Sequence, residues 1–277
     1  MPEGHTLHRL ATSLDEAFGG SPVRASSPQG RFAESAALVD GRVLERAEAY
    51  GKHLFMTFED DVVHVHLGLY GRFDVHRGVP EVPAPVGQVR LRLVGRGPDG
   101  AAYADLRGAT ACELLTPAER EGVLARLGPD PLRADADPER AWERIRRSRA
   151  PVGGLLMDQA VVAGIGNVYR AELLFRHRVD PFRPGRSLRA RQWATMWDDL
   201  VVLMQDGVRT GRIDTVRPDH LTDAELGHTG PRRGHSYVYR RAGEPCRVCG
   251  TRVRTRELQA RNLYWCATCQ RRYRGTA

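Results

Sequence analysis

The chain has 277 residues, which is enough for two domains that each bury a hydrophobic core. Lysine and arginine together number 42 against 34 acidic residues, so the formal net charge is +8. The longest apolar run of the second half, residues 200–204, is far shorter than the roughly 20 residues of a membrane span. The first residues also lack a charged-then-apolar leader, so we expect neither a membrane segment nor a signal peptide.

The first four residues contain a candidate nucleophile. If Met1 is removed, as a small second residue usually allows, Pro2 offers a secondary amine. An α-amino group loses its proton at about pH 8, so a useful fraction of it is nucleophilic at neutral pH. Addition of this amine to the C1′ atom of a sugar gives an iminium ion, and Glu3 stands beside it to donate or accept protons. The alternative is an ordinary frayed terminus in front of a helix.

The first 115 or so residues are expected to be rich in antiparallel strands. Apolar residues between Leu7 and Phe18 recur on one helical face, so a helix should begin directly after Gly4. Residues 63–67 and 89–93 then alternate apolar and polar side chains, which is typical of half-buried strands. This order predicts a sandwich or barrel that carries one helix at its start.

Lys52 is the single lysine among the 42 basic residues. An ammonium group can release its proton near neutral pH, and a guanidinium group cannot. A lysine in a chain whose other basic residues are all arginine is therefore a candidate for proton transfer in catalysis. The alternative is an ordinary exposed lysine.

Helical patterns dominate after Thr116-Pro117. We expect helices over residues 117–127 and 138–148, a pair flanking residues 164–167, and a long helix from residue 187 to about 208. The apolar stripe of the long helix is predicted to be core. Residues 210–236 are polar and irregular and form either a mobile loop or a lid.

The turn Gly164-Ile165-Gly166-Asn167 is a candidate phosphate site. Two glycines let the backbone approach a ligand closely, and the N-terminus of the following helix presents unpaired N–H groups. The alternative for Asn167 is a purely structural N-cap.

The cysteines near the end of the chain form a metal-binding pattern. Cys246-x-x-Cys249 and Cys266-x-x-Cys269 are separated by the 16 residues 250–265, a spacing expected of one structural zinc ion held by four thiolates. Two disulfide bonds are the alternative. Cys112 has no partner pattern and should be a small buried residue.

The same segment is strongly basic. Residues 232–277 contain 12 arginines and 2 glutamates, a local balance of +10, so the rest of the chain is slightly acidic. Clustered cations favour a polyanion, because each phosphate that they neutralise releases counterions. Together with a zinc-type spacing this indicates nucleic-acid binding, and the alternative is a solvated charged face.

Four motifs occur in a fixed order along the chain: Pro2-Glu3-Gly4, Gly51-Lys52-His53-Leu54, residues 164–169, and the four-cysteine ribbon. Together they resemble the formamidopyrimidine-DNA glycosylase and endonuclease VIII family of bifunctional base-excision enzymes. Residues 64–71 and Tyr264-Trp265-Cys266 are similar to the endonuclease VIII branch, and the opening residues 1–7 look like its actinobacterial members.

The resemblance implies roles for individual residues. Pro2 would attack C1′ and form the Schiff base, and Glu3 would donate a proton during base loss. Lys52 would assist as an acid and as a phosphate contact. Arg261, at the ribbon tip, would grip phosphates and aid the second elimination, and Asn167 would contact the DNA backbone.

Base excision also requires a wedge, because a base inside a duplex must be flipped out before it can be reached. Leu69 and Tyr70 follow a strand and are the apolar wedge that we expect to fill the gap. Arg107 resembles part of a second insertion loop. The chain departs from the family pattern at Gly68, where the endonuclease VIII branch commonly has glutamine, and at Ala109, where the formamidopyrimidine branch has an aromatic residue.

The resemblance implies an α+β fold in three parts. Residues 1–116 would form a catalytic antiparallel β-sandwich with a leading helix, residues 117–236 a helical domain with a helix-two-turn-helix motif, and residues 237–277 a zinc ribbon. The protein would be a monomer of the bacterial cytoplasm, associated with the nucleoid when bound to double-stranded DNA that contains damaged bases or abasic sites. His64 and His66 share a strand face, but without a third ligand they should be hydrogen-bonded or DNA-facing rather than metal ligands.

The implied activity is that of a bifunctional DNA glycosylase and AP lyase. It would excise oxidised bases, with pyrimidines favoured, and cut the strand by β- and δ-elimination in base excision repair. One alternative is a glycosylase for oxidised purines such as formamidopyrimidine and 8-oxoguanine. A more remote alternative is a non-catalytic zinc-ribbon protein that binds DNA.

Overall fold

The computed structural model describes residues 2–97, 99–222 and 235–275. The expected removal of Met1, and residues 223–234 of the expected loop 210–236, lie outside the described residues. The chain divides into two compact units, residues 1–126 and 127–277, and each is described by itself. Among the helices of the described residues, none combines the length and the hydropathy needed to span a lipid bilayer.

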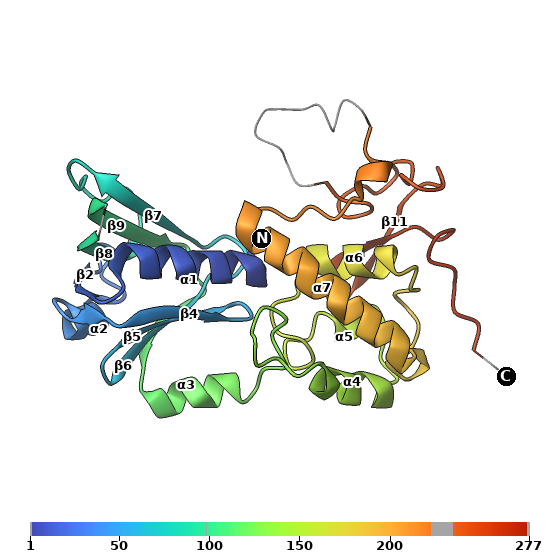
Figure 1. Ribbon diagram of the computed structural model, residues 1–277, viewed down its shortest axis with the longest axis horizontal. Helices are drawn as coiled ribbons and strands as arrows, with labels where there is room; N and C mark the ends of the chain where they lie inside the picture. The colour runs from blue at the N-terminus through green and yellow to red at the C-terminus, as the bar shows by residue number, and fades with distance from the viewer. Residues whose placement is uncertain (1, 98, 223–234, 276–277) are drawn as a thin grey trace. The chain divides into compact units, whose positions relative to one another are not determined.

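The first unit is an antiparallel β-sandwich with a leading helix, as predicted. Its two four-stranded sheets have the strand orders β10-β6-β5-β4 and β2-β8-β9-β7. Figure 1 shows α1 (Gly4–Phe18) lying between the two layers. The strands are β1 (Ser21–Pro22), β2 (Arg24–Ser26), β3 (Val43–Leu44), β4 (Arg46–Tyr50), β5 (His53–Phe58), β6 (Asp61–His66), β7 (Arg72–Val79), β8 (Val89–Gly97), β9 (Gly100–Arg107) and β10 (Ala111–Leu115), and the other helices are α2 (Ala33–Val39) and α3 (Pro117–Leu124).

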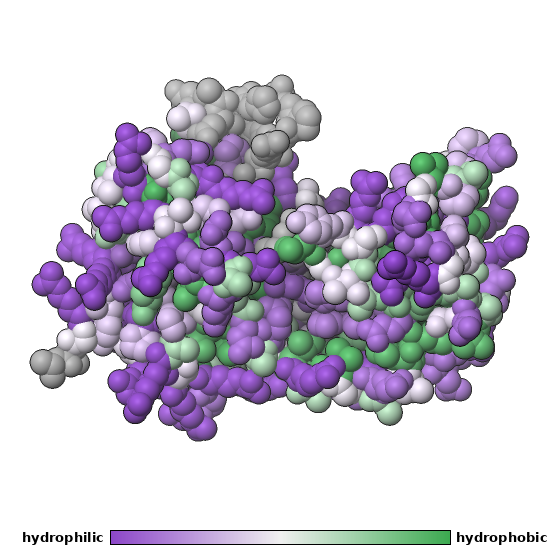
Figure 2. All heavy atoms as spheres, turned by 180° about the vertical axis from the view of Figure 1, so that it is seen from behind, coloured by the Kyte–Doolittle hydropathy of each residue, from purple (hydrophilic) through white to green (hydrophobic). Residues whose placement is uncertain are grey.

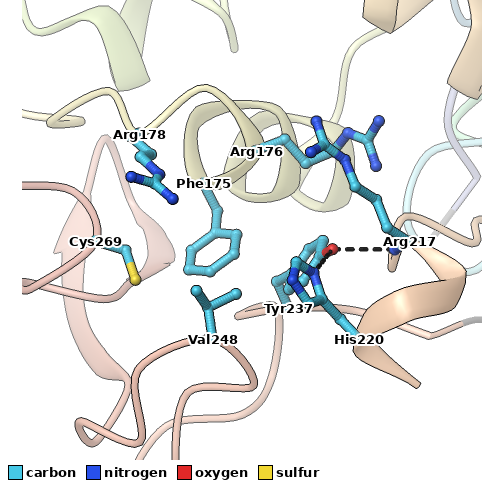
Figure 3. A pocket seen from close by; sticks show the side chains of 8 residues that line it. All are labelled: Phe175, Arg176, Arg178, Arg217, His220, Tyr237, Val248 and Cys269. Carbon is cyan, nitrogen blue, oxygen red and sulfur yellow. Dashed lines mark hydrogen bonds between the residues drawn. The ribbon is translucent and has the colours of Figure 1, made fainter.

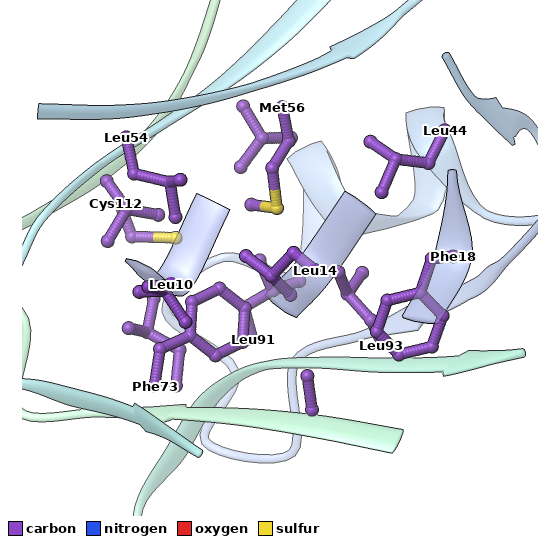
Figure 4. Packing of buried hydrophobic residues seen from close by; sticks show 14 of the residues in the cluster. Leu10, Leu14, Phe18, Leu44, Leu54, Met56, Phe73, Leu91, Leu93 and Cys112 are labelled. Carbon is purple, nitrogen blue, oxygen red and sulfur yellow. The ribbon is translucent and has the colours of Figure 1, made fainter. Parts of the chain in front are cut away.

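The core of the first unit forms around α1. Leu14 is fully buried, and in Figure 4 it lies between Met56 of one sheet and Leu91 of the other. The helix therefore supplies an apolar stripe to both sheets at once, which explains why its residues recur with helical spacing. Cys112 belongs to the same core, as predicted, and burial raises the pKa of its thiol to about 12.

Helix α3 begins where the sequence predicts. The side chain of Thr116 accepts a hydrogen bond from the backbone N–H of Glu119, the side chain of Glu119 accepts from the backbone of Thr116, and Pro117 occupies the first helical turn. This capping box satisfies N–H groups that a helix start leaves unpaired.

The second unit is helical and ends in a ribbon. The predicted stripe of the long helix is buried, including Trp193, Met196 and Leu200. The ribbon hairpin turns at Gln259 and Ala260, which both adopt a positive φ, as a tight two-residue turn requires. The elements are α4 (Pro138–Arg147), α5 (Val152–Leu155), α6 (Asn167–Arg176), the 3-10 helices η1 (Gly185–Ser187) and η2 (Pro218–His220), α7 (Ala190–Thr210), β11 (Arg254–Leu258) and β12 (Arg261–Trp265).

The helix expected before residue 164 is the four-residue α5, which ends at Leu155. After it, the side chain of Gln159 accepts a hydrogen bond from the N–H of Gly164 and donates to the carbonyl oxygens of Met157 and Ile165. These bonds replace helical backbone pairing and close residues 157–165 into a compact turn.

A buried carboxylate organises the segment that leads into the ribbon. Glu172 of α6 is completely buried. It accepts hydrogen bonds from the backbone N–H groups of Tyr237 (2.7 Å), Val238 (2.9 Å) and Tyr239 (2.8 Å), and from the hydroxyl of Thr215 (2.5 Å). Four hydrogen bonds to one carboxyl group tie these residues to α6.

Candidate functional site

Pro2 and Glu3 stand at the start of α1. Pro2 is half-buried, and Glu3 is completely buried at the N-cap position. The backbone oxygen of Glu3 accepts a hydrogen bond from the N–H of Thr6 at 2.8 Å, which fixes the turn that enters the helix. The residue that follows the predicted nucleophile therefore carries a carboxyl group that is shielded from water.

Lys52 lies in the two-residue turn between β4 and β5. Tyr50 and His53 pair across the turn, and Gly51 has a φ of +57°, which glycine adopts without strain. A half-buried lysine on such a tight hairpin has a well-defined position.

The predicted wedge residues are exposed at the tip of a tight turn after β6. Tyr70 is 89% exposed and Leu69 is 40% exposed. The N–H of Gly71 donates to the carbonyl oxygen of Leu67 at 3.1 Å, which closes the turn. An exposed tyrosine beside an exposed leucine on a rigid turn is the geometry that a wedge needs.

The structure explains why residue 68 is a glycine. Its φ is +70°, and a Cβ atom added there would lie 1.9 Å from the hydroxyl oxygen of Thr110. No larger side chain fits without moving Thr110. The departure from glutamine at this position therefore follows from the way the wedge turn packs on the segment after β9.

Arg107 is held within the first unit. Its guanidinium donates to the carboxylates of Asp105 (2.8 Å) and Asp74 (3.3 Å) and to the carbonyl oxygen of Val86 (3.1 Å). The residues that follow it pack against the wedge turn, since a Cβ atom on Gly71 would lie 3.0 Å from the Cα atom of Ala109. The two predicted insertion loops thus form one surface of the first unit.

The second unit brings Asn167 and the ribbon tip together. Asn167 is the first residue of α6. Gly166 occupies the N-cap position, so Asn167 does not cap the helix. Its amide Nδ2 donates to the carbonyl oxygen of Asn262 at 2.9 Å, and its Oδ1 accepts from Arg170. Arg261, next to Asn262, is exposed. The helical motif therefore supports the hairpin that carries the predicted phosphate-gripping arginine.

The four predicted metal ligands lie together. Their sulfur atoms are all within 4.8 Å of one another, with 3.9 Å between Cys246 and Cys269 and 3.4 Å between Cys249 and Cys266. A tetrahedron with Zn–S bonds of about 2.3 Å has S–S edges of roughly 3.8 Å, whereas a disulfide requires about 2.05 Å. The donor set therefore fits one zinc ion with a complete shell, and the disulfide alternative fails.

His64 is buried and hydrogen-bonded, as expected of a histidine that is not a metal ligand. Its Nε2 lies 2.8 Å from Nδ1 of His53. Within the described part of the chain, the four ribbon cysteines are the one cluster of side chains suited to a metal ion.

Most arginines of the ribbon are exposed on its surface. Figure 2 shows that the visible face of the second unit is mainly hydrophilic. The exposed arginines of the ribbon are Arg240, Arg252, Arg254, Arg256, Arg261, Arg271, Arg272 and Arg274.

A hollow of about 90 Å³ lies between the end of α6 and η2 (Figure 3). The hydroxyl of Tyr237 accepts a hydrogen bond from the backbone N–H of Arg217 at 3.0 Å and lies 2.7 Å from Nδ1 of His220. The predicted zinc ligand Cys269 forms part of its wall, so this hollow lies where the ribbon packs against α6.

Comparison with known proteins identifies the family. The formamidopyrimidine-DNA glycosylase N-terminal domain matches residues 1–112, the formamidopyrimidine-DNA glycosylase H2TH domain matches residues 127–218, and the zinc finger found in FPG and IleRS matches residues 243–272. Over 98% of its length the chain is 56% identical to Endonuclease 8 1 of Mycobacterium tuberculosis and covers all of that protein. The chain belongs to the formamidopyrimidine-DNA glycosylase and endonuclease VIII family.

Other relatives agree with this family. Probable endonuclease 8 2 of Streptomyces coelicolor is 34% identical, over 98% of this chain and 94% of that one. Formamidopyrimidine-DNA glycosylase of Parasynechococcus marenigrum is 32% identical, over 98% and 99%. The solved complex of Lactococcus lactis Fpg with an abasic site containing DNA has the same fold, with a TM-score of 0.74 at 21% identity over 98% of this chain and 100% of that one.

Membership of the family gives the protein its general activity. It is a DNA N-glycosylase with AP lyase activity that acts in DNA repair. The zinc-finger match and the four clustered cysteines give it one structural zinc ion.

Loss of zinc should unfold the ribbon, because metal binding and folding of such a small site are coupled. We expect Cys266→Ala to lose its zinc and its affinity for DNA, whereas Cys112→Ala, the matched control, keeps one zinc per chain. Metal content by mass spectrometry of the native protein and binding to a labelled duplex would measure both. Full zinc content in Cys266→Ala would contradict the assignment.

Acid should destabilise the sheet that carries His53. Burial first, then the rings of His64 and His66 and the charges of Arg126 and Lys52, lower the pKa of His53 from 6.5 to about 3. Between these two pH values the unfolded chain binds a proton that the folded chain does not. The contribution of His53 to the free energy of unfolding is therefore fully present above pH 6.5 and is lost as the pH falls toward 3.

His53→Asn, which keeps a donor near the position of Nδ1 but does not titrate, should weaken this pH dependence by about one proton. Hydrogen exchange of the β5 and β6 amides at about pH 7 and about pH 5 would measure it. An identical pH dependence in both proteins would contradict the prediction.

Proposed function

We propose that this enzyme excises oxidised bases, with pyrimidines favoured, through a Schiff base on Pro2 and then cuts the strand by β- and δ-elimination. The observation that supports the mechanism is the complete burial of Glu3, the residue that follows Pro2 at the start of α1. A secondary amine and a water-shielded proton donor are the two groups that imine-forming base excision needs.

The proposed reaction begins when the Pro2 nitrogen, freed by removal of Met1, attacks C1′. The N–C1′ bond forms as the bond from C1′ to the base breaks, and Glu3 supplies the proton with which the base leaves. The C1′–O4′ bond then breaks, O4′ takes up the proton that the Pro2 nitrogen loses, and an iminium ion remains between Pro2 and C1′. Loss of a proton from C2′ expels the 3′-phosphate, and a second elimination expels the 5′-phosphate.

Other residues support these steps from both units. Lys52 acts as an acid and as a phosphate contact of the first unit. Arg261 and Asn167 contact backbone phosphates from the second unit, and Arg261 aids the second elimination. Phosphate contacts of this kind position the DNA without reading its sequence.

The wedge supports a place in the endonuclease VIII branch. Leu69 and Tyr70 are exposed on a closed turn, and Arg107 lies on the neighbouring loop. The relative named Endonuclease 8 1, at 56% identity, is far more similar than the formamidopyrimidine-DNA glycosylase at 32%. Oxidised pyrimidines are therefore the favoured lesions, and oxidised purines are the second candidate.

The three predicted segments complete the proposal. Residues 1–116 serve as the catalytic part, residues 117–236 as the helical DNA-binding part and residues 237–277 as the zinc ribbon. The enzyme works as a monomer in the bacterial cytoplasm on double-stranded DNA with damaged bases or abasic sites.

Borohydride trapping tests the mechanism, because hydride reduces the iminium to a stable amine. We expect wild type to form a covalent adduct with abasic DNA and Pro2→Gly to lose adduct and cleavage by about 10²-fold or more. Glu3→Gln should lose excision of damaged bases but still be trapped on a preformed abasic site. Unimpaired cleavage by Pro2→Gly would favour a non-catalytic DNA-binding role for this terminus.

A lesion panel tests the substrate preference. Duplexes that carry thymine glycol or 8-oxoguanine, each opposite all four bases, would be compared by single-turnover excision. We expect the pyrimidine lesion to be removed at least about tenfold faster, a difference of ~1.4 kcal/mol in the barrier. Faster removal of 8-oxoguanine would place the enzyme with the purine-specific alternative.

A further inference from the structure

Four aromatic rings are stacked on one face of the β10-β6-β5-β4 sheet, and the mechanism above does not use them. His53 and Phe55 alternate on β5, and His64 and His66 alternate on β6. The strand register pairs His53 with His66 and Phe55 with His64, so all four side chains project from one face. Neighbouring ring centres along the series Phe55, His64, His53 and His66 are each 5.1 Å apart.

The two ends of this stack have different surroundings. At one end the guanidinium of Arg120, from α3, lies 5.3 Å from the ring centre of Phe55 and pairs with Glu48 of β4 at 3.0 Å. At the other end, His53 directly follows Lys52, and His66 directly precedes the wedge turn of residues 67–71. The stack therefore runs from the packed contact of Arg120 and Glu48 at one end to Lys52 and the wedge turn at the other.

One hydrogen bond and one contact with a carboxylate favour particular tautomers of two imidazoles of the stack. Nδ1 of His53 and Nε2 of His64 are 2.8 Å apart, so one must donate and the other accept. Nδ1 of His64 faces a carboxylate oxygen of Glu113 at 3.6 Å, which favours a hydrogen rather than a lone pair on that nitrogen. Nε2 of His64 is then the acceptor, Nδ1 of His53 is the donor, and Nε2 of His53 carries no hydrogen.

The surroundings keep the stack uncharged at neutral pH. The charged groups that face it are Glu113 from β10, Glu48 from β4, Lys52 from the turn before β5, and Arg120 and Arg126 from α3 and the segment after it. Burial lowers the pKa of His64 although Glu113 opposes the shift, and burial followed by the charge of Lys52 lowers the pKa of His66. The charge of Lys52 is thus felt by both His53 and His66.

We propose that His53 and His64 are positioning residues for Lys52, with Glu113 fixing their tautomers. The order Glu113, His64, His53 is that of a carboxylate that orients one imidazole, which in turn orients a second. It leaves the lone pair of Nε2 on the residue next to Lys52. In the opposite tautomer of His53, that nitrogen would instead carry a hydrogen. The proposal rests on the proposed role of Lys52.

Substitutions of His64 test the hydrogen bond directly. His64→Gln can place its carbonyl oxygen near the position of Nε2 and accept from His53, whereas His64→Leu cannot. In the full-length, zinc-loaded enzyme with preformed abasic DNA, we expect His64→Leu to cut about tenfold more slowly and His64→Gln to stay within about threefold of wild type. DNA affinity should stay within about twofold in both variants.

Phe55→Leu is the matched control, because it shortens the stack without removing the hydrogen bond. Its cleavage rate should stay within about threefold of wild type. Equal losses in Phe55→Leu, His64→Gln and His64→Leu would show a purely structural role and overturn the proposal, as would an unchanged rate in His64→Leu.

A double-mutant cycle shows whether His64 acts through Lys52. If it does, adding His64→Leu to Lys52→Ala causes no further loss, whereas an independent effect repeats the full loss in both backgrounds and overturns the proposal. A wild-type rate in Lys52→Ala alone, or the absence of a borohydride adduct in wild type, would instead overturn the proposed function. The two failures are therefore distinguishable.

Discussion

The burial of α1 is the constraint on which the first unit depends. Each sheet of the sandwich has an apolar face, and the stripe of α1 fills the space between them, with Leu14 completely buried. A helix fixed along its whole length also fixes its first residue. Glu3 therefore owes its position to hydrophobic packing up to 15 residues along the chain, and so does Pro2, the proposed nucleophile, which precedes it.

Much of this fold could be predicted because its patterns are local. Alternation predicted the strands, helical spacing predicted α1 and α7, and the change of pattern after Thr116-Pro117 marked the start of α3. The shortness of the helix before residue 164 could not be predicted, because the side chain of Gln159 competes with the backbone for hydrogen bonds. Such competition depends on the folded conformation, and residue periodicity does not contain it.

The candidate site also has features that could be predicted from sequence and features that could not. Cysteine spacing and the exposed pair Leu69 and Tyr70 could be predicted from short stretches of sequence. The bonds of Glu172 to residues 237–239, and that between His53 and His64, join residues far apart in sequence or depend on strand register. A one-residue shift in register would separate His53 from His64, so no motif could have predicted their contact.

The close packing of Gly68 against Thr110 constrains how the protein can evolve. Any side chain introduced at residue 68 needs a left-handed backbone and a shift of the Thr110 side chain. A smaller residue at 110 would remove this obstacle, so the two positions should tend to change together among descendants of this sequence. A lineage in which residue 110 became smaller would then be free to acquire a long polar residue beside the wedge.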